Sequence, residues 1–87
     1  MDDIAGWRQR IDEIDARLLG LLNERAACAI EIGRIKQKTG REVYDPAREK
    51  TVIDRLRSLN TGPLSDDAVQ GLFECLIRES RQLEQNE

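Results

Sequence analysis

The sequence predicts an all-α protein in which three helices, one of them very long, form a single domain over residues 1–87. Apolar residues recur at steps of three and four along most of the chain, and no segment shows the period-two alternation of a β-strand. Only Pro46 and Pro63 interrupt this pattern, and they divide the chain into segments of about 2–38, 46–60 and 65–85. A chain of 87 residues suffices for one domain with a modest core.

The first predicted helix is too long for a compact domain of this size. Its apolar stripe continues from end to end through Ile4, Trp7, Ile11, Ile14, Leu18, Leu21, Cys28, Ile32 and Ile35. A helix of about 34 residues measures about 50 Å, whereas a compact domain of this length has a diameter of roughly 30 Å. We therefore predict an intertwined, two-fold homodimer in which a second copy covers the rest of the stripe. The alternative is a helix broken at Gly20, which would give an ordinary bundle.

The ends of the helices carry recognisable capping residues. Thr39-Gly40 is a suitable exit from the first helix. Asp45 is a good N-cap for the second, and Pro46 suits its first position. Ser65 is the predicted N-cap of the third. The apolar residues of the last two helices are Val52, Ile53, Leu56 and Leu59, then Val69, Leu72, Phe73, Leu76, Ile77 and Leu83.

The composition excludes several functions. The chain has no histidine, which rules out histidine acid–base chemistry, and two cysteines without a histidine cannot form an ordinary zinc site. We predict neither a metal site nor a cofactor. A net charge of -3 and 3% aromatic residues argue against nucleic acid as a partner. No apolar run approaches the roughly 20 residues of a membrane span. The acidic start resembles no signal peptide, so we expect a cytoplasmic protein. Cys28 and Cys75 are predicted to be buried core residues.

Several polar residues occupy positions where the helical stripes call for apolar ones. Arg25 follows Leu21 on the first stripe, and Lys36 shares its face at a distance of about 16 Å along the helix axis. Arg48, Ser80 and Glu84 extend the inner faces of the other two helices in the same way. Buried charges are costly unless they are paired or bound. These residues therefore form either a buried ion network, partly reaching solvent at the dimer edge, or a cationic pocket for a small polyanion.

Arg8 is a further candidate for such a pocket. It lies 17 residues before Arg25, which is about 25 Å along a straight helix. It cannot reach the same pocket within one chain. In an antiparallel dimer, the N-terminal end of the partner chain could bring Arg8 there.

Four segments resemble the all-helical class of chorismate mutases. They are WRQRIDEIDARLL (7–19), LLNER (21–25), IGRIK (32–36) and VYDPARE (43–49), and the resemblance extends over nearly the whole chain. It implies an intertwined helical homodimer with two active sites. It also implies an isomerase that converts chorismate to prephenate in aromatic amino acid biosynthesis, by a pericyclic reaction that needs no cofactor.

The resemblance also assigns roles to individual residues. Lys36 would donate a hydrogen bond to the ether oxygen of chorismate. Glu84 occupies the position of a glutamine in many members, and it could donate to the same oxygen only when protonated. Arg48 would assist with a carboxylate and the enolpyruvyl side chain. Arg25 and Arg8 from the partner chain would hold the two substrate carboxylates. The other residues that would bind the substrate are Arg48, Ser80 at the ring carboxylate, and Glu49 and the backbone near Asp45 at the hydroxyl.

Other interpretations of the sequence remain. A lyase that removes pyruvate from isochorismate would use the same fold and much the same pocket. A helical dimerisation or regulatory module without catalytic activity would neither turn over chorismate nor bind anions. The chain could also be one domain of a larger bifunctional enzyme.

Overall fold

The computed structural model describes residues 3–85 and consists of three helices. These are α1 (Asp3–Thr39), α2 (Pro46–Leu59) and α3 (Asp66–Gln85). Residues 3–85 contain no β-strand. The predicted all-α class is therefore confirmed, and each helix begins and ends within about one residue of the predicted bounds.

The end of α1 and the start of α2 are both capped by the predicted residues. Gly40 follows α1 with a φ of 71°, a conformation that glycine adopts without a steric penalty. The amide of Arg41 donates to the carbonyl of Lys36 at 2.9 Å, which is the long hydrogen bond of a Schellman cap. At the start of α2, the side chain of Asp45 accepts from the amide of Arg48 at 3.1 Å.

Side-chain hydrogen bonds also order the turn between α2 and α3. The amide group of Asn60 donates to the carboxylate of Asp66 at 2.8 Å. The hydroxyl of Ser65 accepts from the amide of Ala68 at 3.0 Å and caps α3 as predicted. These bonds direct α3 back toward α1.

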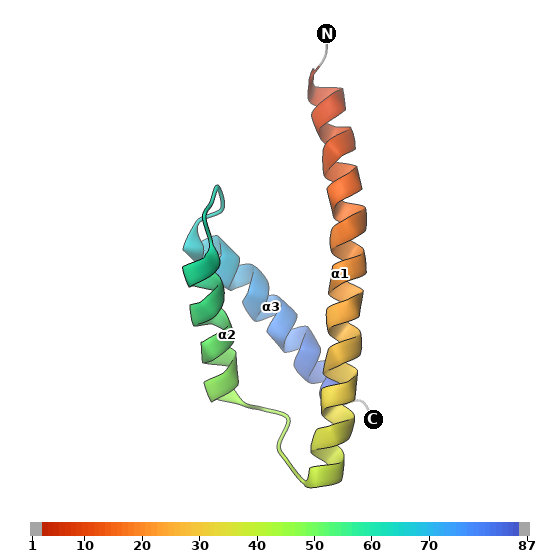
Figure 1. Cartoon of the computed structure of the whole chain (residues 1–87), viewed down its shortest axis with the longest axis vertical. Helices are drawn as coiled ribbons and strands as arrows, with labels where there is room; N and C mark the ends of the chain where they lie inside the picture. Colours follow the sequence, from red (N-terminus) through yellow and green to blue (C-terminus); the bar gives the residue numbers. More distant parts are fainter. Residues whose placement is uncertain (1–2, 86–87) are drawn as a thin grey trace.

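The molecule is elongated because α1 extends far beyond the other two helices (Figure 1). Its principal dimensions are 60 × 25 × 15 Å, and its radius of gyration is 16.3 Å, against about 12 Å for a compact domain of this length. α1 is continuous through Gly20, so the alternative of a helix broken there is wrong.

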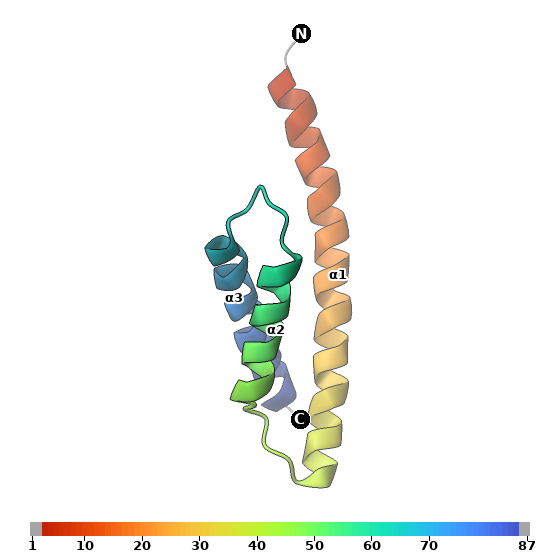
Figure 2. The same ribbon diagram turned by 60° about the vertical axis from the view of Figure 1, so that its left-hand side comes forward.

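α2 and α3 lie beside the C-terminal half of α1. α2 runs back antiparallel to α1, and α3 then crosses obliquely toward the end of α1 (Figures 1 and 2). α3 packs against both of the other helices, whereas within residues 3–85 α1 and α2 have no Cα atoms within 8 Å of each other. α3 therefore connects α1 and α2, whose backbones lie apart from each other.

The N-terminal half of α1 leaves its apolar stripe uncovered in the single chain. Trp7 is 66% exposed and Leu21 is 62% exposed. The buried apolar residues are Ala29 and Ile77, at the crossing of α1 and α3. The single chain therefore cannot bury its own stripe, as the length of the first helix predicts.

The expectation that both cysteines are buried is wrong for the single chain. Cys28 and Cys75 are free thiols and both are exposed. The small apolar residue that α3 covers on this part of α1 is Ala29, the next residue in the chain.

Gly33 is the point of closest approach between α1 and α3. A Cβ atom at this position would lie 2.7 Å from both the Cα and the carbonyl oxygen of Glu84. These are backbone atoms of a helix, which cannot rotate away as a flexible side chain can. The absence of a side chain at Gly33 therefore sets the distance between the two helices.

We expect Gly33→Ala to destabilise the protein by about 1–3 kcal/mol, since the added methyl group must push α3 away. Gly71→Ala is the matched control, because nothing lies within 4 Å of its added Cβ. It should be neutral or stabilising by up to about 1 kcal/mol. Urea unfolding at one fixed protein concentration measures both effects. Equal stability of the two variants would contradict the proposed close contact.

Candidate active site

A cavity of about 400 Å³ lies between the three helices at the C-terminal half of α1. This volume falls within the usual range of small-molecule sites. The structure brings together at this cavity seven of the eight residues predicted for the site, namely Arg25, Lys36, Asp45, Arg48, Glu49, Ser80 and Glu84. The eighth, Arg8, lies on the exposed N-terminal half of α1 and does not line the cavity.

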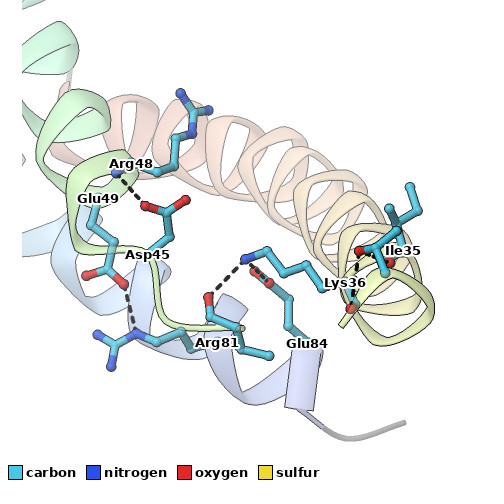
Figure 3. A network of polar contacts seen from close by, with 9 residues as sticks. Ile35, Lys36, Asp45, Arg48, Glu49, Arg81 and Glu84 are labelled. Carbon is cyan, nitrogen blue, oxygen red and sulfur yellow. Dashed lines mark hydrogen bonds and ion pairs between the residues drawn. The ribbon is translucent and has the colours of Figure 1, made fainter. Parts of the chain in front are cut away.

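Lys36 and Glu84 form an ion pair across the crossing of α1 and α3 (Figure 3). The ammonium Nζ lies 2.8 Å from Oε1 of Glu84, and the two side chains are only 13% and 12% exposed. The same ammonium donates to the backbone carbonyl of Val43 at 2.9 Å. A lysine ammonium has three hydrogens. These two partners use two of them, which leaves one N–H for a ligand in the cavity.

Arg25 and Ser80 form a second contact between α1 and α3. Nη1 of Arg25 donates to the hydroxyl of Ser80 at 2.5 Å. The hydroxyl itself donates to the carbonyl of Leu76 at 2.9 Å. Ser80 therefore uses its hydrogen on its own helix and presents a lone pair to the guanidinium. This fixes one edge of Arg25 and leaves most of its five N–H donors for a ligand.

The first turn of α2 contributes three of the predicted residues. Asp45 caps this turn, which places Arg48 and Glu49 one turn further along. The guanidinium of Arg48 points away from the carboxylate of Glu49 (Figure 3). Glu49 lies instead against α3, where its Oε2 is 3.0 Å from Nε of Arg81.

Arg81 is a cavity residue that the sequence interpretation missed. The carbon of its guanidinium lies 5.1 Å from the centre of the Tyr44 ring, within the range of a cation–π contact. It also lines the cavity, as does Arg41 from the connection between α1 and α2. A signal for Arg81 exists in the sequence, because it follows the buried Ile77 at a spacing of four and so continues the inner face of α3.

The charges around the cavity do not balance. Its five cations are Arg25, Lys36, Arg41, Arg48 and Arg81, and its three carboxylates are Asp45, Glu49 and Glu84. The cavity therefore carries a formal charge of +2 at pH 7, within a chain whose net charge is -3. Such a concentration of positive charge, in a cavity with walls of low dielectric constant, favours a small dianion.

The described residues place limits on other chemistry. Within residues 3–85, no group of three or more His, Cys, Asp or Glu side chains is arranged to hold a metal ion. None of the three described helices combines the length and the apolar character needed to span a bilayer. The site can hold a ligand through directed N–H donors and can stabilise negative charge beside Lys36.

The fold and this cavity define a helical protein with a site for a small anion between its helices. The sequence matches the family described as chorismate mutase type II over residues 7–85. The chain belongs to this family, and the resemblance inferred from its sequence motifs is confirmed.

Two curated relatives differ in how much of their length the chain covers. It is 38% identical to the bifunctional chorismate mutase/prephenate dehydratase of Pseudomonas aeruginosa, over 97% of this chain but only 24% of the relative. The chain thus spans about a quarter of the length of this bifunctional relative. It is 34% identical to the chorismate mutase of Methanocaldococcus jannaschii, over 97% of this chain and 86% of the relative.

Solved structures share the whole fold. The chorismate mutase of Thermus thermophilus, in form II, superposes with a TM-score of 0.96 at 32% identity, over 99% of this chain and 98% of that one. The chorismate mutase of Helicobacter pylori in complex with prephenate superposes with a TM-score of 0.87 at 29% identity, over 95% and 90% of the two chains.

Proposed function

We propose that this chain is a chorismate mutase that converts chorismate to prephenate. The observation that carries the proposal is the cavity of charge +2, which complements the two carboxylates of chorismate. The relatives named chorismate mutase and the structural neighbour that binds prephenate support the same substrate class. The reaction is unimolecular: one C–O bond breaks as one C–C bond forms. It requires no proton transfer, nucleophile, metal or cofactor.

Restraint of the substrate is the first contribution of the site. Chorismate must adopt the compact conformer that brings its reacting carbons together, and fixed donors can hold it there. Arg25 is suited to this task because Ser80 already orients its guanidinium. Arginine binds a carboxylate through two parallel hydrogen bonds, which fixes direction as well as position. Arg48 lies on the other side of the cavity, where it is free of Glu49 and can bind the second carboxylate.

Electrostatic stabilisation is the second contribution. Negative charge grows on the ether oxygen of chorismate as the C–O bond breaks. We propose that the remaining N–H of Lys36 donates to this oxygen. Because Glu84 and Val43 hold the ammonium in place before the substrate binds, little reorganisation accompanies the reaction.

Lys36→Ala should lower kcat by about 10²- to 10³-fold, which is the usual loss when one such donor is removed. The assay follows the disappearance of chorismate by ultraviolet absorption and identifies the product. Prephenate is expected from the wild-type chain, whereas salicylate and pyruvate would indicate the isochorismate lyase. Circular dichroism controls for loss of fold in the variant. A kcat within tenfold of the wild type would contradict the role of Lys36.

Glu84 has a less simple role. In the structure it accepts a hydrogen bond from Lys36, as an ionised carboxylate does. A carboxylate cannot donate to the ether oxygen, whereas the protonated acid can. We propose that the protonated form of Glu84 provides the second donor to that oxygen. The active form of the enzyme would then contain one proton more than the resting ion pair.

This role predicts that the wild-type rate climbs as the pH falls from about 8 to about 5. Glu84→Gln should make the rate nearly independent of pH over this range, because an amide N–H is always present. Glu79→Gln is the matched control, since Glu79 is an exposed residue of the same helix and lies outside the cavity. It should keep the wild-type profile. A wild-type rate that does not change with pH would refute the donor role.

We also propose that two copies of the chain form a dimer with shared sites. The uncovered stripe at the N-terminal half of α1 supports this, because an apolar surface of this length is costly to expose to water. Arg8 lies on the same half of α1, about 25 Å from Arg25. An antiparallel partner would place its Arg8 beside the cavity of the first chain, where it would bind a substrate carboxylate.

A shared site predicts that two inactive variants regain activity when their subunits exchange. In a mixed dimer of Arg8→Ala and Arg25→Ala chains, one of the two sites keeps both arginines. At equal amounts with random exchange, about a quarter of the wild-type activity should return. The matched control mixes Arg25→Ala with Lys36→Ala, whose residues both come from the same chain. That mixture should stay inactive, and equal behaviour of the two mixtures would contradict the shared site.

A further inference from the structure

Glu49 is an unusual residue to find beside a substrate that carries two carboxylates. Like charges at close range repel each other, so a carboxylate in such a cavity needs both a partner and a purpose. The other two carboxylates of the cavity already have partners, since Asp45 caps α2 and Glu84 pairs with Lys36. The partner of Glu49 is Arg81, at 3.0 Å.

Arg81 is itself held on two sides. Its Nε is buried against Glu49, and its guanidinium plane lies near the ring of Tyr44. The contact with Glu49 is an ion pair without the alignment of a hydrogen bond, so attraction between the two charges provides most of it. Stacking on an aromatic ring restricts the guanidinium further. Tyr44 and Arg81 together therefore restrict the positions that the Glu49 carboxylate can adopt.

The contact leaves one oxygen of Glu49 for a ligand. The interactions found among residues 3–85 engage Oε2, on the side facing Arg81. A carboxylate oxygen only accepts hydrogen bonds. Of the polar groups of chorismate at neutral pH, the ring hydroxyl alone can donate one. Glu49 can therefore contribute to binding only at that hydroxyl, provided that its charge is offset and its orientation is fixed.

We propose that Arg81 is a positioning residue that holds Glu49 against the ring hydroxyl of the substrate and so makes the site selective for the hydroxylated ring. This inference rests on the proposed function. In this role Arg81 acts through Glu49. The positive charge of Arg81 also offsets the repulsion between the Glu49 carboxylate and a bound dianion.

The test compares chorismate with an analogue that keeps both carboxylates and lacks the ring hydroxyl. Arg81→Ala should lower kcat/KM for chorismate about tenfold, the usual effect of losing a hydrogen bond to a charged group. It should lower kcat/KM for the analogue less, because the analogue loses only the attraction of one positive charge in the cavity, so that the selectivity of the enzyme falls. Tyr44→Leu keeps the ion pair and removes the stacking, and it should lower the selectivity partly. This second variant keeps the inference testable if Arg81→Ala does not fold.

Two controls separate positioning from structural support. Arg78→Ala removes an exposed arginine of the same helix that does not line the cavity, and it should leave the selectivity unchanged. In a Glu49→Gln background, Arg81→Ala should have little further effect on the selectivity, because both changes disturb the same contact.

The possible results are distinct. An equal loss on both substrates, or no loss on either, would overturn the role of Arg81. If the wild-type chain converts neither compound, the proposed function fails and the inference fails with it. If it converts both, the outcome for the Arg81 variants decides the inference alone.

Discussion

The approach of α3 to α1 at Gly33 is the constraint on which the site depends. The backbone of Glu84 occupies the space that a Cβ at this position would need. Lys36 lies one turn beyond Gly33 on the same side of α1, so the close approach brings its ammonium to the carboxylate of Glu84. Ser80 lies one turn earlier on α3 and meets Arg25 further back along α1. A wider separation of the two helices would break both contacts.

This crossing also explains how the cavity remains open beside so many cations. α3 keeps α1 and α2 apart, and the gap between them is lined by side chains of all three helices. One carboxylate and one hydroxyl hold two of the cations in place, through the contacts of Lys36 with Glu84 and of Arg25 with Ser80. These contacts lower the repulsion among the cations and leave N–H donors free. The cavity can therefore keep its shape and still attract a dianion.

The sequence predicts the helices well because their ends depend on local interactions. Gly40, Asp45 and Ser65 each make the backbone or capping contact expected of their type. Most cavity residues can also be predicted from local sequence. Helical spacing alone places these polar residues on the same faces as the apolar stripes. Arg81 is not among the predicted residues, because the prediction rests on the row of Leu76, Ser80 and Glu84, whereas Arg81 continues the neighbouring row from Ile77.

The spacing of residues does not predict which side chains of different helices contact each other. The family resemblance places Lys36 and Glu84 at the same substrate oxygen, but residue spacing does not indicate that they pair with each other or that Arg81 turns to Glu49. These contacts depend on the crossing geometry of α3. The cysteines illustrate the same limit. Cys28 falls on the predicted stripe, yet α3 covers its neighbour Ala29, because a rotation of α1 by a fraction of a turn decides which residue faces the crossing.

α1 combines two roles along its length, and this links assembly to chemistry. Its C-terminal half carries Arg25 and Lys36 to the cavity, and its N-terminal half carries Arg8 and the exposed stripe. The charge of +2 is complete within one chain, so a single chain has the electrostatic means to attract a dianion. Attraction alone does not restrain a flexible molecule, because each carboxylate needs donors from a direction that opposes the other. An arginine from the far end of a partner's α1 would add such a direction. In the proposed dimer, this contribution would account for the extension of α1 beyond α2 and α3.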